Sequence, residues 1–266
     1  MARARGIEFS CPVQSSRAAR VGAGASVVKG HPKHYPHLLP ANIVLVAAGD
    51  QDPPLIGGAL CLDFANTIDA RFPRAGTTPP DFIATYEQLV LWSQRAGALD
   101  APTARKLLVR ARREPKAARA AVSAARRLRE AIYTLFAAMR EGRESPASAA
   151  RELARFTGRA LERGRLVANA ETNALSWSWP RLELQSMLWP IALSALELAT
   201  SSEVVSLKQC PGHDGRCGWL FLDRTKNQSR RWCTMQVCGN AEKTRQQNAR
   251  RRRARNRRTR PKDPTA

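Results

Sequence analysis

The chain has 266 residues, 43% of them hydrophobic, and a formal net charge of +22 at pH 7. This length allows one sizeable domain with a hydrophobic core and a second, smaller one. No stretch approaches the roughly 18 consecutive apolar residues of a membrane-spanning helix, so we expect no membrane span.

The positive charge is concentrated towards the C-terminal end. Residues 208–266 contain 17 basic and 4 acidic residues, whereas residues 51–207 contain 21 and 16. Such a concentration is typical of a segment that binds a polyphosphate. A solvated basic tail that binds nothing specifically has the same composition.

Residues 1–54 are rich in Arg, Ala, Ser, Gly and Pro and show no sustained hydrophobic period. We therefore expect a disordered, basic N-terminal extension. The apolar piece at 43–48 starts too far along the chain for a signal peptide. A transit peptide and an over-extended start site are alternative explanations. Cys11 has no partner in sequence and is expected to be incidental.

The ordered part is expected to begin near Leu55. In GGALCLDFANTID the apolar residues alternate at Leu60, Leu62 and Phe64, which predicts a strand. Three polar residues lie in and after this strand and are candidate ligand contacts: Asp63, Asn66 and Thr67. The alternative for Asn66 and Thr67 is that they cap the end of the strand by bonding the local backbone.

Helical periodicity recurs along the next hundred residues. Asp81 is a candidate N-cap for a helix that ends at Gly97, and Pro115 suits the first turn of a long helix. The other expected helices are Pro102–Arg113, Pro115–Arg140, Pro146–Arg163 and Leu182–Thr200. Strands are expected at 166–167 and 174–179, joined by a turn at 169–173, and at 204–207. The pattern predicts an α+β fold, mainly helical with a small sheet.

Arg129 lies within the apolar stripe of the long helix. A buried Arg there needs a carboxylate or an anionic ligand, and Asp63 is a candidate partner; a surface Arg is the alternative. We therefore predict that Asp63, Asn66 and Arg129 hold a small anionic effector. All four histidines lie outside 55–207, and the chain has no glycine-rich phosphate loop, so we expect no enzyme.

Four cysteines form two pairs near the C-terminal end, Cys210/Cys217 and Cys233/Cys238. Four thiolates in two clusters suit one tetrahedral Zn²⁺, and because all positions are filled by protein, the metal is structural and not catalytic. Disulfides are an alternative, but a chain of this size in a reducing cytoplasm favours free thiols. His213 is an alternative ligand in place of Cys210.

The residues between the two pairs are apolar and then basic. Trp219–Leu222 and Arg230–Trp232 predict a hairpin whose aromatic side chains pack beside the metal. Such a module is too small to bury an adequate core alone, so zinc is expected to supply much of its folding energy.

A helix is expected beyond Gly239, with Asn240 as its N-cap and an end near Arg260. It has no apolar stripe, and its arginines repel one another, so we expect its outer half to fray without a polyanion. We predict that basic residues of the module and the tail contact phosphates. They are Arg230, Arg231, Lys243, Arg245, Arg250, Arg251, Arg252 and Arg253.

The stretch WLFLDRTKNQSRRWCTMQVCGN, with Lys243 and Arg245 after it, resembles the CGNR zinc finger, a bacterial module. The match departs at Ala241, where the family has Arg. Upstream, LCLDFANTID, YEQLVLWSQRAGAL, LREAIYTLFAAM and WPIALSALELA resemble, in that order, the ABATE domain that is usually found before such a finger. This second resemblance covers about Leu55 to Ala199.

The two resemblances imply a bacterial, stress-related transcription regulator in which a ligand-sensing domain precedes a DNA-binding zinc module, in the cytoplasm and associated with the nucleoid. RNA binding and a zinc-stabilised protein-interaction module are the alternatives. The expected organisation is a basic extension at 1–54, a sensor domain at 55–207, a zinc finger at 208–249 and an Arg-rich tail at 250–266. Oligomeric state and target sequence stay open.

Overall fold

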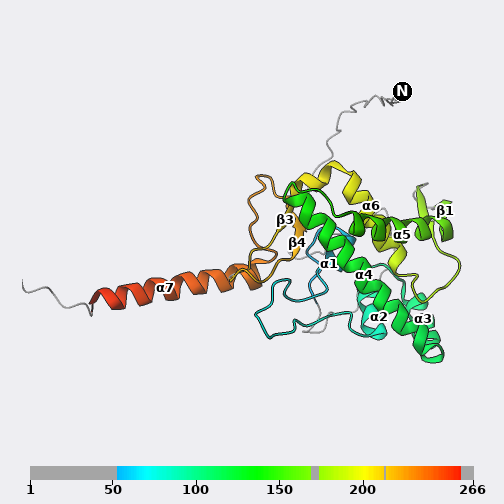
Figure 1. Ribbon diagram of the computed structural model, residues 1–266, viewed down its shortest axis with the longest axis horizontal. Coiled ribbons are helices and arrows are strands. Elements are labelled where there is room, and N and C mark those ends of the chain that lie inside the picture. The colour runs from blue at the N-terminus through cyan, green and yellow to red at the C-terminus, as the bar shows by residue number, and fades with distance from the viewer. Residues whose placement is uncertain (1–52, 169–173, 213, 259–266) are drawn as a thin grey trace, which may run out of the picture. The chain divides into compact units, whose positions relative to one another are not determined.

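The computed structural model describes residues 53–168, 174–212 and 214–258, and these are mostly helical with two small sheets (Figure 1). The expected α+β architecture is therefore confirmed. The α-helices are α1 (Leu60–Ala65), α2 (Tyr86–Arg95), α3 (Ala101–Arg113), α4 (Pro115–Arg140), α5 (Ala147–Arg163), α6 (Leu188–Thr200) and α7 (Asn240–Arg258). The strands are β1 (Arg165–Ala168), β2 (Leu175–Ser178), β3 (Leu207–Gln209) and β4 (Leu220–Leu222).

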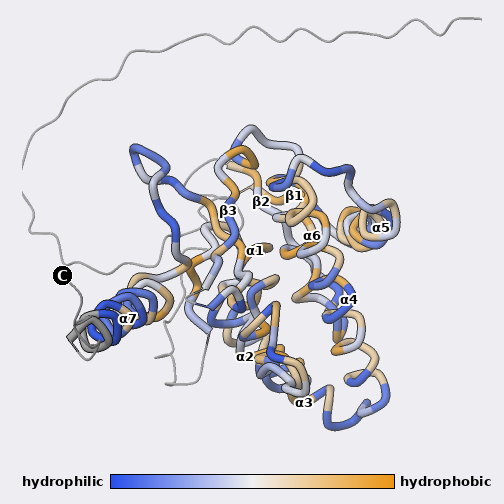
Figure 2. The backbone as a smooth tube through the Cα atoms, turned by 60° about the vertical axis from the view of Figure 1, so that its left-hand side comes forward, coloured by the Kyte–Doolittle hydropathy of each residue, from blue (hydrophilic) through white to orange (hydrophobic). Residues whose placement is uncertain are grey.

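The core lies where α4, α5 and α6 pack on one another and on the short α1. Its largest fully buried side chains include Phe64, Phe136, Phe156 and Trp189. α6 is hydrophobic along most of its length in Figure 2, whereas α7 is mostly hydrophilic. A helix that is apolar on nearly all sides belongs inside a protein, and α6 accordingly forms part of the core.

Three predicted helices agree with the structure to within about one residue: α3, α4 and α5. Asp100 caps α3, because its carboxylate accepts the Thr103 N–H at 2.7 Å. Pro115 occupies the first turn of α4, as expected. β1 and β2 pair antiparallel, with Leu166 opposite Trp177; the expected turn at 169–173 lies outside the described residues.

The strand predicted at 60–64 is wrong, because these residues form the helix α1. A short apolar run is ambiguous between strand and buried helix. All six residues of α1 are buried, on every side of the helix. Alternation of polar and apolar residues indicates a strand only when one face is exposed, so the pattern is not informative for this segment. The packing of α1 against α4 and α6 decides its conformation.

The helix expected to start at Asp81 instead starts at Tyr86. Thr85 caps it with a reciprocal bond to Gln88, in which the Thr85 hydroxyl accepts the Gln88 N–H at 3.2 Å. Asp81 does not cap α2; its backbone forms an isolated bridge with Ile68, and its side chain accepts the Ile83 N–H at 3.0 Å.

The predicted helix Leu182–Thr200 is too long by six residues, because α6 begins only at Leu188. A longer helix would place Pro190 in its interior, where the ring clashes with the preceding turn; starting at Leu188 puts Pro190 in the first turn. After α6, a 3₁₀ turn at Ser202–Ser206 replaces most of the strand expected at 204–207, and β3 begins at Leu207.

Two expectations about the zinc module also need correction. The hairpin partner of β4 is β3, with Leu207 opposite Leu222, and residues 230–232 form no strand. Asn240 is the first residue of α7 and not its cap. A π-helical turn, Met235–Gly239, leads directly into α7, and Thr234 caps that turn by accepting the Val237 N–H at 3.1 Å.

Candidate metal centre and nucleic-acid interface

The four predicted cysteine ligands come together in one cluster, with all four sulfur atoms within 4.8 Å of one another. The Cys217 and Cys233 sulfurs are 3.7 Å apart, and those of Cys233 and Cys238 are 3.6 Å apart. Zn–S bonds of about 2.3 Å in a tetrahedron place neighbouring sulfurs about 3.8 Å apart. The cluster therefore has the dimensions of a tetrahedral zinc site. The cysteines are free thiols and not disulfides.

Tight backbone turns bring the first pair of ligands into position. Cys210 follows β3 directly, and the Gly212 N–H points at its sulfur at 3.4 Å. Gly212 has a φ of 65°, and a Cβ at this position would lie 2.8 Å from the Cys217 backbone nitrogen. Only glycine fits such a turn. The alternative ligand His213 lies outside the described residues.

The metal site is closed and structural. Cys210, Cys233 and Cys238 are buried, and they pack with the buried side chains of Trp219 and Phe221. While protons occupy the cluster, hydrogen bonds among the four thiols raise the pKa of Cys217 and Cys233 and lower the pKa of Cys210 and Cys238, so the cluster holds protons on some of its thiols. Zinc binding has to displace these protons, so zinc affinity falls at low pH. One zinc held by four protein thiolates leaves no position for an activated water.

The zinc module is joined to the helical domain through Asn66, at the end of α1. The Asn66 amide donates to the Leu220 carbonyl at 2.8 Å, and its carbonyl accepts the Leu220 N–H at 2.9 Å. The side chain thus pairs with β4 as a neighbouring strand would. Of the two polar residues expected to bond the local backbone, only Thr67 does so, donating to the Phe64 carbonyl at 2.8 Å.

A second group of contacts, which sequence reasoning missed, centres on Arg71 and Tyr133. The Arg71 N–H donates to the carbonyl of the ligand Cys217 at 2.9 Å, and the Arg71 guanidinium lies 4.0 Å from the centre of the Tyr133 ring. The Tyr133 hydroxyl donates to the Gly218 carbonyl at 3.2 Å and accepts from Gln209 at 2.8 Å. No local motif signals these contacts, because their partners are far apart in sequence.

The residues predicted to hold an effector are engaged with protein groups. Asp63 accepts the Gly57 N–H at 2.7 Å, and Asn66 pairs with β4. Arg129 is buried, but its carboxylate partners are Asp81, at 2.7 Å, and Glu130, at 3.0 Å, and not the candidate Asp63. Three cavities with volumes from 340 to 570 Å³ are lined by other residues. Effector binding at these three residues stays a prediction.

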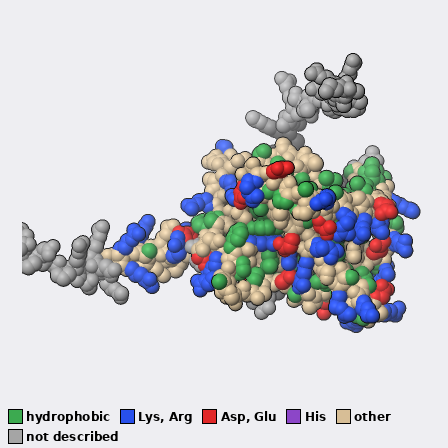
Figure 3. Space-filling model, viewed as in Figure 1, with side chains coloured by type: hydrophobic (Ala, Val, Ile, Leu, Met, Phe, Trp, Pro, Cys, Tyr) green, Lys and Arg blue, Asp and Glu red, His purple; other side chains and the backbone are tan. Residues whose placement is uncertain are grey.

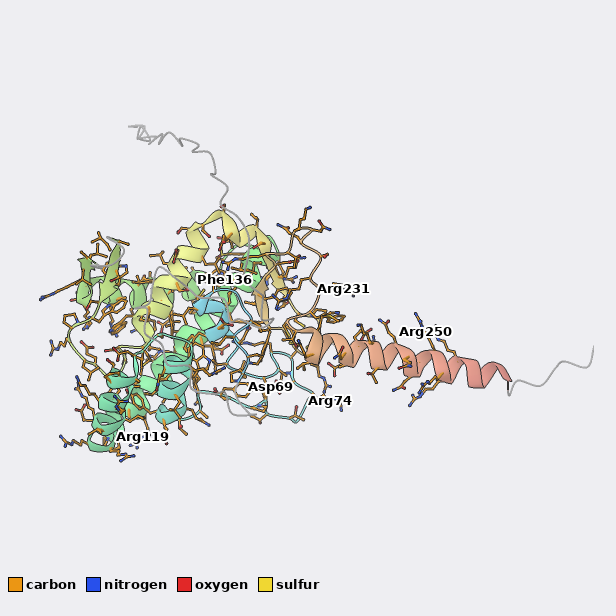
Figure 4. All side chains as sticks on the ribbon, turned by 180° about the vertical axis from the view of Figure 1, so that it is seen from behind. Asp69, Arg74, Arg119, Phe136, Arg231 and Arg250 are labelled. Carbon is orange, nitrogen blue, oxygen red and sulfur yellow. The ribbon has the colours of Figure 1, made fainter. Side chains whose placement is uncertain are left out.

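Arg230 is half-buried and acts inside the zinc module. Its guanidinium lies 4.2 Å from the centre of the Phe221 ring and donates to backbone carbonyls of Ile56, Trp232 and Cys233. Burial lowers the pKa of Arg230, although nearby Cys233 and Asp223 oppose this. The structure therefore gives Arg230 a bracing role, whereas its neighbour Arg231 is exposed (Figure 4).

Asp223 holds the loop that leads to Arg230. Its buried carboxylate accepts from Lys208 at 2.7 Å and from the Arg230 N–H at 2.8 Å. Burial alone raises the pKa of Asp223, but these bonds and those from Thr225 outweigh it, so the pKa lies well below its usual value. The ion pair and the hydrogen bonds of Asp223 therefore hold this loop in place, next to the metal ligands.

The remaining predicted nucleic-acid contacts lie on α7. Every side chain from Lys243 to Arg253 is exposed, and Figures 3 and 4 show basic side chains on α7, with Arg250 labelled. Arg245 pairs with Glu242 at 2.8 Å, and hydrogen bonds from Arg245 and Gln246 lower the pKa of Glu242 to about 2. Ala241, where the resembling family has Arg, is half-buried.

Comparison with known proteins agrees with this architecture. Residues 58–202 match the model of the ABATE family, described as "Putative stress-induced transcription regulator". Residues 206–251 match the CGNR zinc finger model, which covers all four cysteines. No curated protein matches the chain. The ABATE match covers more than half of the sequence, and the chain therefore belongs to the ABATE family and carries a CGNR zinc finger after its ABATE domain.

Proposed function

We propose that this zinc-binding regulator binds duplex DNA through α7, which contains the arginine run at 250–253. The observation that carries the proposal is the character of residues 243–253, which include six basic and no acidic residues, all exposed. A helix with this charge and no apolar face would bury no apolar surface by packing into a core, and its charged groups would lose their hydration. It gains free energy when its guanidinium groups displace counterions from phosphates.

The dimensions of α7 suit this role. Its 19 residues correspond to about 28 Å of helix at 1.5 Å per residue. The major groove of DNA admits an α-helix, where arginines reach both phosphates and guanine edges. The zinc centre fixes the start of this helix, because Cys238 lies in the turn that leads into α7. Arg231 and Lys243 are the basic residues near the metal that we propose as further contacts.

We further propose that the protein acts by binding and not by catalysis, in the bacterial cytoplasm at the nucleoid. Among the described helices, none is long and apolar enough to cross a membrane. The helical domain would act as the sensor of a small anion. It would pass its state to the zinc module through the contacts of Asn66, Arg71 and Tyr133, and the zinc module would pass it on to α7.

Salt dependence of binding tests the DNA proposal. Each phosphate contact contributes about 0.9 to the slope of log affinity against log salt, so six contacts give a slope of about −5 on duplex DNA. Replacing Arg250, Arg251, Arg252 and Arg253 with Gln should weaken binding to all sequences and flatten the slope by about 3 to 4. The measurement is fluorescence anisotropy with a labelled duplex at several salt concentrations.

A matched control removes the same charge elsewhere. Four exposed arginines outside the tail, changed together to Gln, should leave the slope nearly unchanged; they are Arg74, Arg105, Arg113 and Arg151. A slope near zero in the intact protein would refute electrostatic nucleic-acid binding and favour a protein-interaction module. Tighter binding to single-stranded RNA of equal length, in a parallel titration, would favour the RNA alternative.

A further inference from the structure

The helical domain contains a cavity of about 570 Å³ to which the zinc module contributes no residue. Its walls come from α3, the start of α4, α5, the segment 181–185 and Trp189 of α6. Six of the twelve lining residues are charged, and four of these six are arginines. The charged residues are Arg110, Glu114, Arg159, Arg163, Arg181 and Glu183.

Both glutamates of the cavity are already paired with arginines. Arg110 binds Glu114 at 2.8 Å, and Arg163 binds Glu183 at 2.9 Å. Arg159 and Arg181 are exposed, and neither has a carboxylate partner among the described residues. Two positive charges therefore stay uncompensated at one cavity. In Figure 3 several blue side chains gather over the region where α5 lies.

The wall that carries Arg181 is held in place by buried and half-buried hydrogen bonds. Arg110 donates to the Leu182 carbonyl at 2.7 Å, and the Tyr86 hydroxyl donates to the Leu184 carbonyl at 3.0 Å. The Ser186 hydroxyl accepts the Glu183 N–H at 2.8 Å. A site whose walls are fixed before binding loses less conformational entropy when a ligand enters.

We propose that this cavity binds a small anion with at least two negative charges, which Arg159 and Arg181 neutralise from α5 and from the 181–185 wall. Guanidinium groups form paired hydrogen bonds with both phosphoryl and carboxylate oxygens. The volume lies within the range of small-molecule sites, about 300–1,000 Å³. This inference deepens the proposed sensing role and does not depend on DNA binding by α7, so the two proposals can fail separately.

The test uses the full-length, zinc-loaded protein and isothermal titration with pyrophosphate and with citrate, at constant ionic strength set by chloride. At least one of the two should bind, and comparing them distinguishes phosphoryl from carboxylate ligands. The double variant Arg159→Gln/Arg181→Gln should bind at least tenfold more weakly. The control Arg74→Gln/Arg151→Gln has the same charge change on exposed residues outside the cavity and should bind as the wild type does.

Thermal unfolding of both variants checks that the exposed substitutions leave the fold intact. Equal weakening in the two double variants would overturn the proposal, because it would reduce binding to overall charge. Absence of binding by both anions at 10 mM, roughly the weak limit for a small ligand, would also overturn it. So would loss of DNA affinity in Arg159→Gln/Arg181→Gln without any small-anion binding, which would make the cavity part of a nucleic-acid surface.

Discussion

For single residues, the ion pair between the buried Arg129 and the half-buried Asp81 shows how a charge is accommodated in the helical domain. Arg129 also donates to Glu130 and to the Thr67 carbonyl, so its donors are distributed over three partners. Burial raises the pKa of Asp81, but the hydrogen bond and charge of Arg129 outweigh it, so the pKa lies below its usual value. The pair joins α4 to the segment before α2.

Asp81→Asn should lower the free energy of unfolding at pH 7 by about 1 to 2 kcal/mol. This is less than for a fully buried pair, because the half-buried Asp81 is partly screened by solvent and Glu130 still faces Arg129. Since folding lowers the Asp81 pKa, its contribution is complete above the usual carboxyl pKa of about 3.9 and is lost as the pH falls through the folded-state value. The difference between wild type and variant should therefore be constant from pH 7 to 5 and shrink below about pH 4.

Urea unfolding at three pH values measures this difference, and zinc loss at low pH affects both proteins alike. Asp69→Asn is the matched control, because Asp69 is exposed. It should change the free energy of unfolding little at any pH. An unchanged difference between wild type and Asp81→Asn at pH 3.5 would contradict the role given to this ion pair.

At the scale of elements, the pairing of α1 with β4 joins two parts of the chain that match different family models. Leu220 and Leu222 of β4 belong to the same buried cluster as α1 and α4, whereas Phe221, between them, packs beside the cysteines. Because side chains of a strand point alternately to its two faces, one face of β4 packs in the core of the helical domain and the other packs beside the cysteines. Among the described strands, β4 pairs only with β3. The Asn66 side chain bonds the N–H and the carbonyl of Leu220, which a further strand would otherwise bond.

Asn66→Ala should lower the free energy of unfolding by about 3 kcal/mol, because it leaves the buried N–H and carbonyl of Leu220 without partners. Asn248→Ala, at an exposed position of α7, should have almost no effect. The measurement is urea unfolding with saturating zinc. Equal stability of the two variants would mean that water or a shifted backbone replaces the Asn66 contacts.

For the molecule as a whole, the turns that carry the metal ligands also contact the helical domain. The ligand Cys217 accepts the Arg71 N–H through its carbonyl, and Gly218 approaches so closely that a Cβ there would lie 2.6 Å from the Arg71 Cβ. We expect that loss of the metal would loosen these turns, and that the two β4 leucines in the helical core would loosen with them. Metal binding and folding of the helices are therefore expected to be linked.

Removal of zinc with a chelator, or Cys233→Ser, should lower the urea midpoint of the helical circular dichroism signal as well as release the metal. An independent finger would lose zinc without any change in the helical transition. Cys61→Ala serves as a control for loss of a thiol: Cys61 is buried in α1, where burial raises its pKa to about 12, so it stays a neutral thiol outside the metal site. This variant should keep its full zinc content.

Features that depend on residues close together in the chain could be predicted from the sequence. Ligand spacing identified the four cysteines, helical periodicity identified α3, α4 and α5, and the arginine run identified an exposed basic helix. Features that depend on packing between distant segments needed the structure: α1 is a helix, Arg129 pairs with Asp81, and Arg159 and Arg181 share a cavity. Asn66 and its partner Leu220 are 154 residues apart, so the hydrophobic pattern of either segment cannot reveal the contact between them. In α1, burial between other helices overrides the local preference for a strand.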